Sequence, residues 1–195
     1  MFQSIDRNAF REIFQPSRIV LAIVKDKEHN RWNFLPIAFN MYCGYKPLTF
    51  CFAIHDVNYS YSLLENEPFF AIAVPGESLS HIILESGMES GSHINKFEKY
   101  KLTPIISDDG KFCYGIHECI ANMFCIKKEF LKVSDHAIVV GSVEKILRNY
   151  SNHERNLLSV SQDVRGFEVL QQQAIHRIAV KDVNHSSTKP VKSRD

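Results

Sequence analysis

The chain has 195 residues, of which 45% are hydrophobic and 11% aromatic, and its 23 basic residues balance 22 acidic ones. This length and composition predict one globular domain with a substantial core, and they exclude an intrinsically disordered chain. The near-zero net charge excludes a global field that would favour nucleic acid, a membrane surface or an acidic partner. No apolar run reaches the roughly 20 residues that a membrane-spanning helix needs.

The cysteines and the N-terminal segment point to one compartment. There are five cysteines, an odd number, and none stands in a C-x-x-C spacing. Free thiols in a reducing environment are the simplest interpretation. Residues 1–14 are charged and lack the apolar core of a signal peptide. We therefore expect a cytoplasmic protein.

The apolar runs are short, and several are rich in β-branched residues, which is typical of strands. Polar segments separate them, such as DKEHNR at 26–31 and CGYK at 43–46. In chain order, the predicted strands are residues 17–25, 32–40, 47–55, 68–75, 118–126, 136–147 and 175–180. Several strands at this spacing predict an antiparallel barrel or sandwich.

Helical patterns are fewer. Apolar residues recur at helical spacing in residues 58–66, 77–86 and 94–100, and more weakly in residues 153–160. Asn58 or Ser60 is expected to cap the first of these helices. Residues 184–195 are polar and carry no core signal, so we expect a disordered tail after a single domain at 1–183.

Two predicted strands are apolar on both faces. Residues 19–24 and 50–54 do not alternate apolar with polar side chains, as a half-exposed antiparallel strand would. Something must therefore cover the second face. The alternatives are a dimer partner, a packed helix or a flat cofactor.

Several chemistries have no support in the sequence. There is no phosphate-binding P-loop, no G-x-G-x-x-G and no G-x-S-x-G nucleophile motif. The nine histidines show no metal-ligand spacing, so we expect no metal site, and we interpret His55, His136 and His176 as strand-end or core histidines. The paired carboxylates at 108–109 precede a glycine and predict a turn. We therefore expect no catalytic acid–base pair.

Three ordered blocks resemble the flavin reductase-like family, in its flavoredoxin-like branch. The first runs from Asn33 and Pro36 through Phe39-Asn40 and Pro47-Leu48 to the Asn-Tyr-Ser-Tyr turn at 58–61. The second is SGSHINKFEKYKLTP at 90–104. The third joins ECIANMFC, which begins at 118, to SDHAIVVGSVEKI, which begins at 134, and VLQQQAIHRIAV closes the pattern. The resemblance covers about residues 15–180.

The resemblance implies a mainly β fold with a few helices, an antiparallel Greek-key split β-barrel that forms a homodimer and binds FMN near the dimer interface. It also implies an NAD(P)H-dependent flavin reductase in which hydride passes to flavin N5. The cofactor carries that chemistry, so no catalytic side chain is required. Two alternatives stay open. One is a flavin-binding electron carrier or sensor that is not a reductase, and the other is a split-barrel interaction module without flavin.

The candidate FMN-binding residues follow from the same blocks. A flavin ring needs a flat apolar slot, and its phosphate needs N–H groups, hydroxyls and often a cation. The predicted set is Asn33, Ile37, Ala38, Phe39, Asn40, Ala53, Tyr59, Ser60, Ser90 and Lys96.

The chain departs from the family pattern at four positions. Ser92 replaces the phosphate-facing arginine, Asn95 an aspartate, Asn58 a frequent arginine and Leu48 a proline. Loss of an arginine from a phosphate site would weaken binding by roughly 1.5–3 kcal/mol if nothing replaced it.

Overall fold

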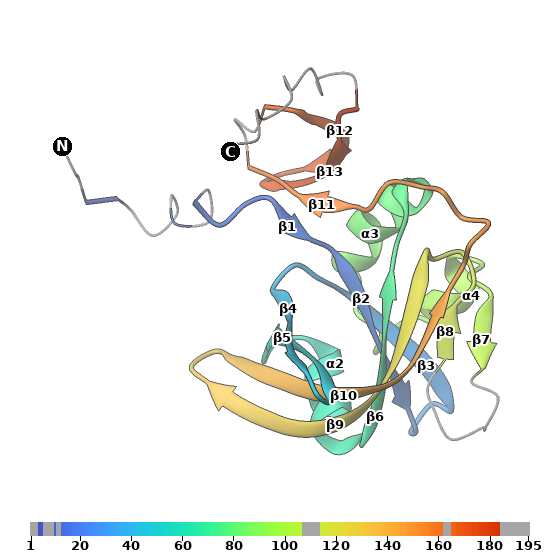
Figure 1. The fold of residues 1–195 in the computed structure, drawn as a ribbon. Coiled ribbons are helices and arrows are strands. Elements are labelled where there is room, and N and C mark those ends of the chain that lie inside the picture. Colours follow the sequence, from blue (N-terminus) through green and yellow to red (C-terminus); the bar gives the residue numbers. More distant parts are fainter. Residues whose placement is uncertain (1–3, 6–9, 11–12, 107–113, 162–164, 184–195) are drawn as a thin grey trace, which may run out of the picture.

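The computed structural model describes residues 4–5, 10, 13–106, 114–161 and 165–183 (Figure 1). Its largest sheet has seven strands, and every neighbouring pair is antiparallel. In spatial order they are β3 (Arg31–Ile37), β2 (Val20–Asp26), β6 (Phe69–Val74), β9 (Ala121–Val133), β10 (His136–Arg148), β5 (Leu48–His55) and β4 (Asn40–Tyr45). The predicted mainly β, antiparallel split barrel is confirmed.

Two smaller sheets and a few short helices complete the described part of the chain. One sheet runs in the order β1 (Ser17–Arg18), β11 (Leu158–Ser159), β13 (His176–Lys181) and β12 (Phe167–Gln173). The other pairs β7 (Pro104–Ile106) with β8 (Tyr114–Ile116). The helices are α2 (Tyr59–Asn66), the 3-10 turn η1 (Glu77–Leu79), α3 (Ser80–Gly87) and α4 (Lys96–Lys99). They confirm the three stronger helix predictions.

Strand β2 lies between two hydrophobic cores, which explains its unbroken apolar sequence. Leu21 and Ile23 belong to one core, with Ile82 and Ile83 of α3 and Phe97 of α4. The alternate side chains belong to a second core, to which α2 also contributes; they are Val20, Ala22 and Val24. Helices α3 and α4 therefore cover one face of this strand, and other strands with Leu64 of α2 cover the second face, so its sequence by itself does not require a dimer partner.

The second two-faced strand, β5, behaves differently. Phe50, Phe52 and Ile54 are buried in the second core. Ala53 points the other way, is only partly buried, and lines a groove described below. Of the three alternatives for covering an apolar face, a flat ligand therefore remains open at β5.

Three sequence predictions were wrong in detail. The second predicted strand ends at Ile37, and after two residues the chain continues as β4, which pairs with β5 at the other end of the strand order and includes part of the expected CGYK turn. Strand β9 extends to Val133, because its half-exposed outer end pairs with β10 and carries polar residues. Residues 153–160 form no helix. Leu157 is fully buried there, and its carbonyl accepts a hydrogen bond from the Ile19 N–H at 3.1 Å.

Some predictions concern residues that the structure does not describe, and others can be checked for only part of the residues involved. The turn at 108–110 and the tail at 184–195 are not described. The cysteines that are described are free thiols: Cys43, Cys51, Cys119 and Cys125. Among the described residues, none of the helices has the length and apolar character needed to traverse a bilayer.

Candidate functional site

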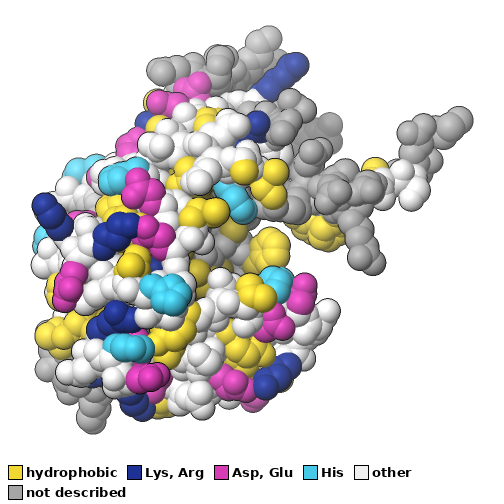
Figure 2. Space-filling view, turned by 180° about the vertical axis from the view of Figure 1, so that it is seen from behind, with side chains coloured by type: hydrophobic (Ala, Val, Ile, Leu, Met, Phe, Trp, Pro, Cys, Tyr) yellow, Lys and Arg dark blue, Asp and Glu magenta, His cyan; other side chains and the backbone are white. Residues whose placement is uncertain are grey.

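An apolar groove of about 280 Å³ lies where the β3–β4 corner meets β5 and α3. The predicted residues Ile37, Ala38, Phe39 and Ala53 all line it. Figure 2 shows a hollow bordered by hydrophobic and histidine side chains on this side of the molecule. Sequence reasoning missed much of the remaining lining, which comes from α3 and from strand ends: Ile83, Leu84, Gly87, Met88, His55, His136, His176 and Ile178. These three histidines do lie at strand ends, as expected.

The groove reaches the start of α2. Asn58 lines the groove and occupies the N-cap position, but its side chain does not cap the helix. It donates instead to the His55 carbonyl at 3.2 Å, so the expected cap is wrong. The first turn of α2 carries no acidic residue. An uncapped helix start presents N–H groups and a partial positive charge, and both favour an anion.

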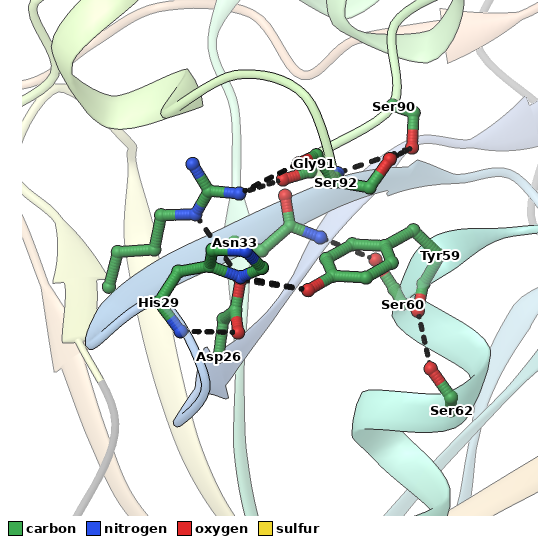
Figure 3. A network of polar contacts seen from close by, with 10 residues as sticks. Asp26, His29, Asn33, Tyr59, Ser60, Ser62, Ser90, Gly91 and Ser92 are labelled. Atoms are coloured by element: carbon green, nitrogen blue, oxygen red, sulfur yellow. Dashed lines mark hydrogen bonds and ion pairs between the residues drawn. The ribbon is translucent and has the colours of Figure 1, made fainter.

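Asn33 and Ser60 meet beside this helix start. Both are buried, and the Asn33 Nδ2 donates to the Ser60 Oγ at 2.7 Å. The Asn33 Oδ1 is buried without a hydrogen-bond partner. Figure 3 shows the Asn33 carboxamide lying between Ser60 and the turn at residues 90–92. A side chain at Gly91 would overlap this carboxamide, which explains the glycine.

The turn at residues 90–92 brings two hydroxyls together. The Oγ atoms of Ser90 and Ser92 are 2.7 Å apart, and the Ser92 N–H donates to the Ser90 Oγ at 3.2 Å. Arg31 holds the turn, since its Nη2 donates to the Gly91 carbonyl at 2.5 Å and to the Ser92 carbonyl at 3.3 Å. The structure therefore brings Asn33, Ser60 and Ser90 into one region, together with an arginine that the sequence analysis had not selected.

Asp26 organises the base of this region. Its side chain is fully buried and accepts hydrogen bonds from the Tyr59 hydroxyl at 2.9 Å and the Arg31 Nε at 3.2 Å, and it pairs with the His29 Nδ1 at 2.9 Å. Burial opposes ionisation, but the hydrogen bonds from His29, Tyr59 and Arg31 outweigh it and lower the pKa of Asp26. The carboxylate thus fixes both Arg31 and the predicted Tyr59. For Asp26, His29 and Arg31, the polar segment DKEHNR was the only signal in the sequence.

Two predicted residues have partners elsewhere. Lys96 is buried, and its ammonium donates to the Ser86 carbonyl at 2.7 Å and the Phe34 carbonyl at 3.1 Å. Asn40 donates to the Arg18 carbonyl at 2.8 Å and the Ile37 carbonyl at 3.2 Å. These contacts fasten backbone segments around the groove. A role for either residue in ligand binding stays a prediction.

The arrangement suits a ligand with two unlike ends. The groove offers apolar side chains to a flat ring, and the region around α2 and residues 90–92 offers N–H groups, hydroxyls and one guanidinium to an anion. The groove lining contains no paired carboxylates among the described residues. The arrangement can therefore bind and orient such a ligand.

Comparisons with solved structures agree with the fold. The chain is similar to an FMN-binding protein from Thermus thermophilus, with a TM-score of 0.71 and 16% identity over 83% of this chain and 91% of the other. It is also similar to an NADH:FAD oxidoreductase from Streptomyces globisporus, with a TM-score of 0.68 and 15% identity over 81% and 92% of the two chains. At these identities the likeness shows the fold.

Sequence comparisons give the family itself. A curated protein of uncharacterised function from Archaeoglobus fulgidus is 32% identical over 100 residues, which span 51% of this chain and 56% of that protein. The profile of the "Flavin reductase like domain" matches residues 10–168, which is most of the chain. The chain belongs to the flavin reductase-like family.

Proposed function

We propose that this protein binds FMN in the apolar groove and acts as an NAD(P)H-dependent flavin oxidoreductase. The observation that carries the proposal is that the groove reaches an uncapped helix start, beside which lies a buried, unpartnered amide oxygen. Asn58 lines the groove, and Asn33 contacts Ser60 two residues further along. A flavin nucleotide has a flat ring, hydroxyl donors and a phosphate, which match these three features in kind.

In this proposal the ring lies against Ile37, Ala38, Phe39 and Ala53. The small Ala53 side chain leaves room at the groove floor, and apolar walls exclude water from the ring. A ribityl hydroxyl would supply the donor that the Asn33 Oδ1 lacks. Bound flavin supplies hydride and electron transfer, while the side chains position it.

The phosphate end depends on a substitute for the arginine that Ser92 replaces. We assign that role to Arg31, because its guanidinium already contacts the turn that carries Ser92. Lys96, the cation expected from the sequence, is occupied with two carbonyls. The hydroxyls of Ser60, Ser90 and Ser92 and the first-turn N–H groups of α2 would complete the anion site.

The proposal is tested in two steps on the full-length protein. Titration with FMN, followed by quenching of flavin fluorescence, should show saturable binding at one site per chain. Anaerobic addition of NADH or NADPH should then bleach the flavin absorbance. Bleaching by dithionite but by neither nicotinamide would remove the reductase assignment and favour an electron carrier. A chain that binds no FMN would be an interaction module instead.

A homodimer is the second part of the proposal. Four large side chains on and beside the edge strand β4 are at least half exposed: Phe39 (59%), Met41 (61%), Tyr42 (64%) and Tyr45 (75%). Exposed apolar patches on an edge strand beside a binding groove commonly mark an interface. We expect light scattering to give twice the chain mass of 22.5 kDa. Tyr42→Glu should shift the species toward the monomer, and a wild-type mass of one chain would contradict the assignment.

The free thiols agree with a cytoplasmic location, which stays part of this proposal.

A further inference from the structure

Three potential metal ligands meet at the open end of the groove. His55 ends β5, His136 begins β10, and the two residues face each other in the β5–β10 register. Their rings therefore lie on the same side of the sheet, with centroids 4.7 Å apart. Asp135, in the turn before His136, reaches both rings. Its Oδ1 is 2.7 Å from the His136 Nδ1, and its Oδ2 is 3.8 Å from the His55 Nε2.

The spacing of these groups is close to that of a metal site. One ligand atom from each residue lies within 4.8 Å of the other two. Around a metal ion with bonds of about 2.1 Å, ligand atoms stand roughly 3.3 Å apart. Rotations of partly exposed side chains can close this difference, since the side chains of His55, Asp135 and His136 are 37%, 64% and 28% exposed.

A second carboxylate orients one of the histidines. The Asp56 Oδ1 lies 2.9 Å from the His55 Nδ1. The Val57 N–H approaches the same nitrogen at 3.3 Å, but the shorter carboxylate contact favours a proton on Nδ1. The Nε2 atom that faces Asp135 is then the free, basic nitrogen. A carboxylate that orients a histidine in this way is the usual support of a metal-binding imidazole.

We propose that His55, Asp135 and His136 bind a divalent first-row transition-metal ion, for which zinc is the probe. Two imidazoles and one carboxylate form a donor set that such ions prefer. Three protein ligands leave at least one coordination position open. Because both histidines line the groove, the open position is available to a groove-bound molecule. The site does not depend on flavin binding. Residues 55 and 136 are far apart in the chain, so no spacing motif announces it.

Calorimetric titration of the metal-stripped, full-length protein with zinc tests the proposal. One equivalent should bind per chain, and His55→Ala should abolish this step. Asp56→Asn leaves all three ligands in place and should weaken zinc binding by about 10- to 100-fold. His81→Ala is the matched control, because His81 is exposed on α3 and lies outside the cluster. Unchanged zinc binding in His55→Ala would overturn the proposal, as would no binding to the wild type.

Cobalt provides a second test, which begins with the wild type and then uses a variant whose fold is checked separately. Cobalt bound by the wild type should give visible ligand-field bands. Zinc should displace the cobalt, and the bands should then disappear. His136→Gln, which keeps a polar side chain of similar volume, should lose the bands while its circular dichroism stays that of the wild type. Bands that persist at full strength in the folded variant would show that the metal binds elsewhere.

Discussion

Arg31→Ala is expected to weaken FMN binding by about 10- to 150-fold, while riboflavin binding changes little. This corresponds to the roughly 1.5–3 kcal/mol of a hydrogen bond to a charged group. The Nε and Nη2 atoms of Arg31 are held by Asp26 and by the carbonyls of Gly91 and Ser92. The remaining Nη1 makes no hydrogen bond to any described residue, and under the proposed assignment it is the atom that would contact the phosphate. Riboflavin lacks the phosphate and should not detect the loss.

Fluorescence titration of each variant with both flavins measures this difference. Arg148→Ala is the matched control, because it removes the same charge from a side chain that lies over the Tyr150 ring. Equal losses for FMN and riboflavin would mean that Arg31 only shapes the turn. Unchanged FMN affinity would contradict the assignment of Arg31 to the phosphate.

The groove residues were accessible from sequence because they follow a local pattern. Ile37, Ala38 and Phe39 are adjacent in the chain at the end of a strand, and the family blocks mark that corner. Ser60 at a helix start is equally local. Their exact partners are not local, since the pairing of Asn33 with Ser60 depends on how α2 packs beneath β3.

Arg31 could not be found in the same way. The family pattern places its arginine at position 92, where this chain has serine, and residue 31 ends a polar segment that carries no family motif. Only the return of β3 beneath residues 91–92 brings the guanidinium to that turn. The cluster of His55, Asp135 and His136 depends similarly on strand register. When a site takes its charged side chains from elements that are far apart in the chain, the sequence shows no motif with a fixed spacing.

Lys96 presents the opposite case, because a residue that matches the family pattern is buried. Lys96 is the candidate phosphate cation of the second family block, and that role stays a prediction. Its side chain is 2% exposed, and its ammonium lies over the Phe34 ring. Burial lowers the pKa of Lys96 to about 8, although Glu89 opposes the shift. Nothing in the local sequence indicates this burial, because it results from packing of α4 against β3 and α3.

This burial predicts how the free energy of unfolding depends on pH. The folded-state pKa of Lys96 lies below its unfolded value, so the unfolded chain binds more protons between about pH 8 and 10.5. The contribution of this group to stability therefore rises with pH across that window, by about 3 kcal/mol, and it is lost as the pH falls through 8. The Lys96→Met variant lacks this group, so the increase in the free energy of unfolding that Lys96 causes between pH 8 and 10.5 should disappear.

Urea unfolding of the wild type and Lys96→Met at a series of pH values from 7 to 10.5 measures the effect. The contributions of other titrating groups cancel in the difference between the two proteins, which should grow by about 3 kcal/mol in favour of the wild type. Lys99→Met, on the same helix but with a side chain that is 43% exposed, should show no comparable growth. A pH-independent difference for Lys96→Met would mean that the buried ammonium keeps an ordinary pKa. The carbonyls of Ser86 and Phe34 would then compensate fully for its burial.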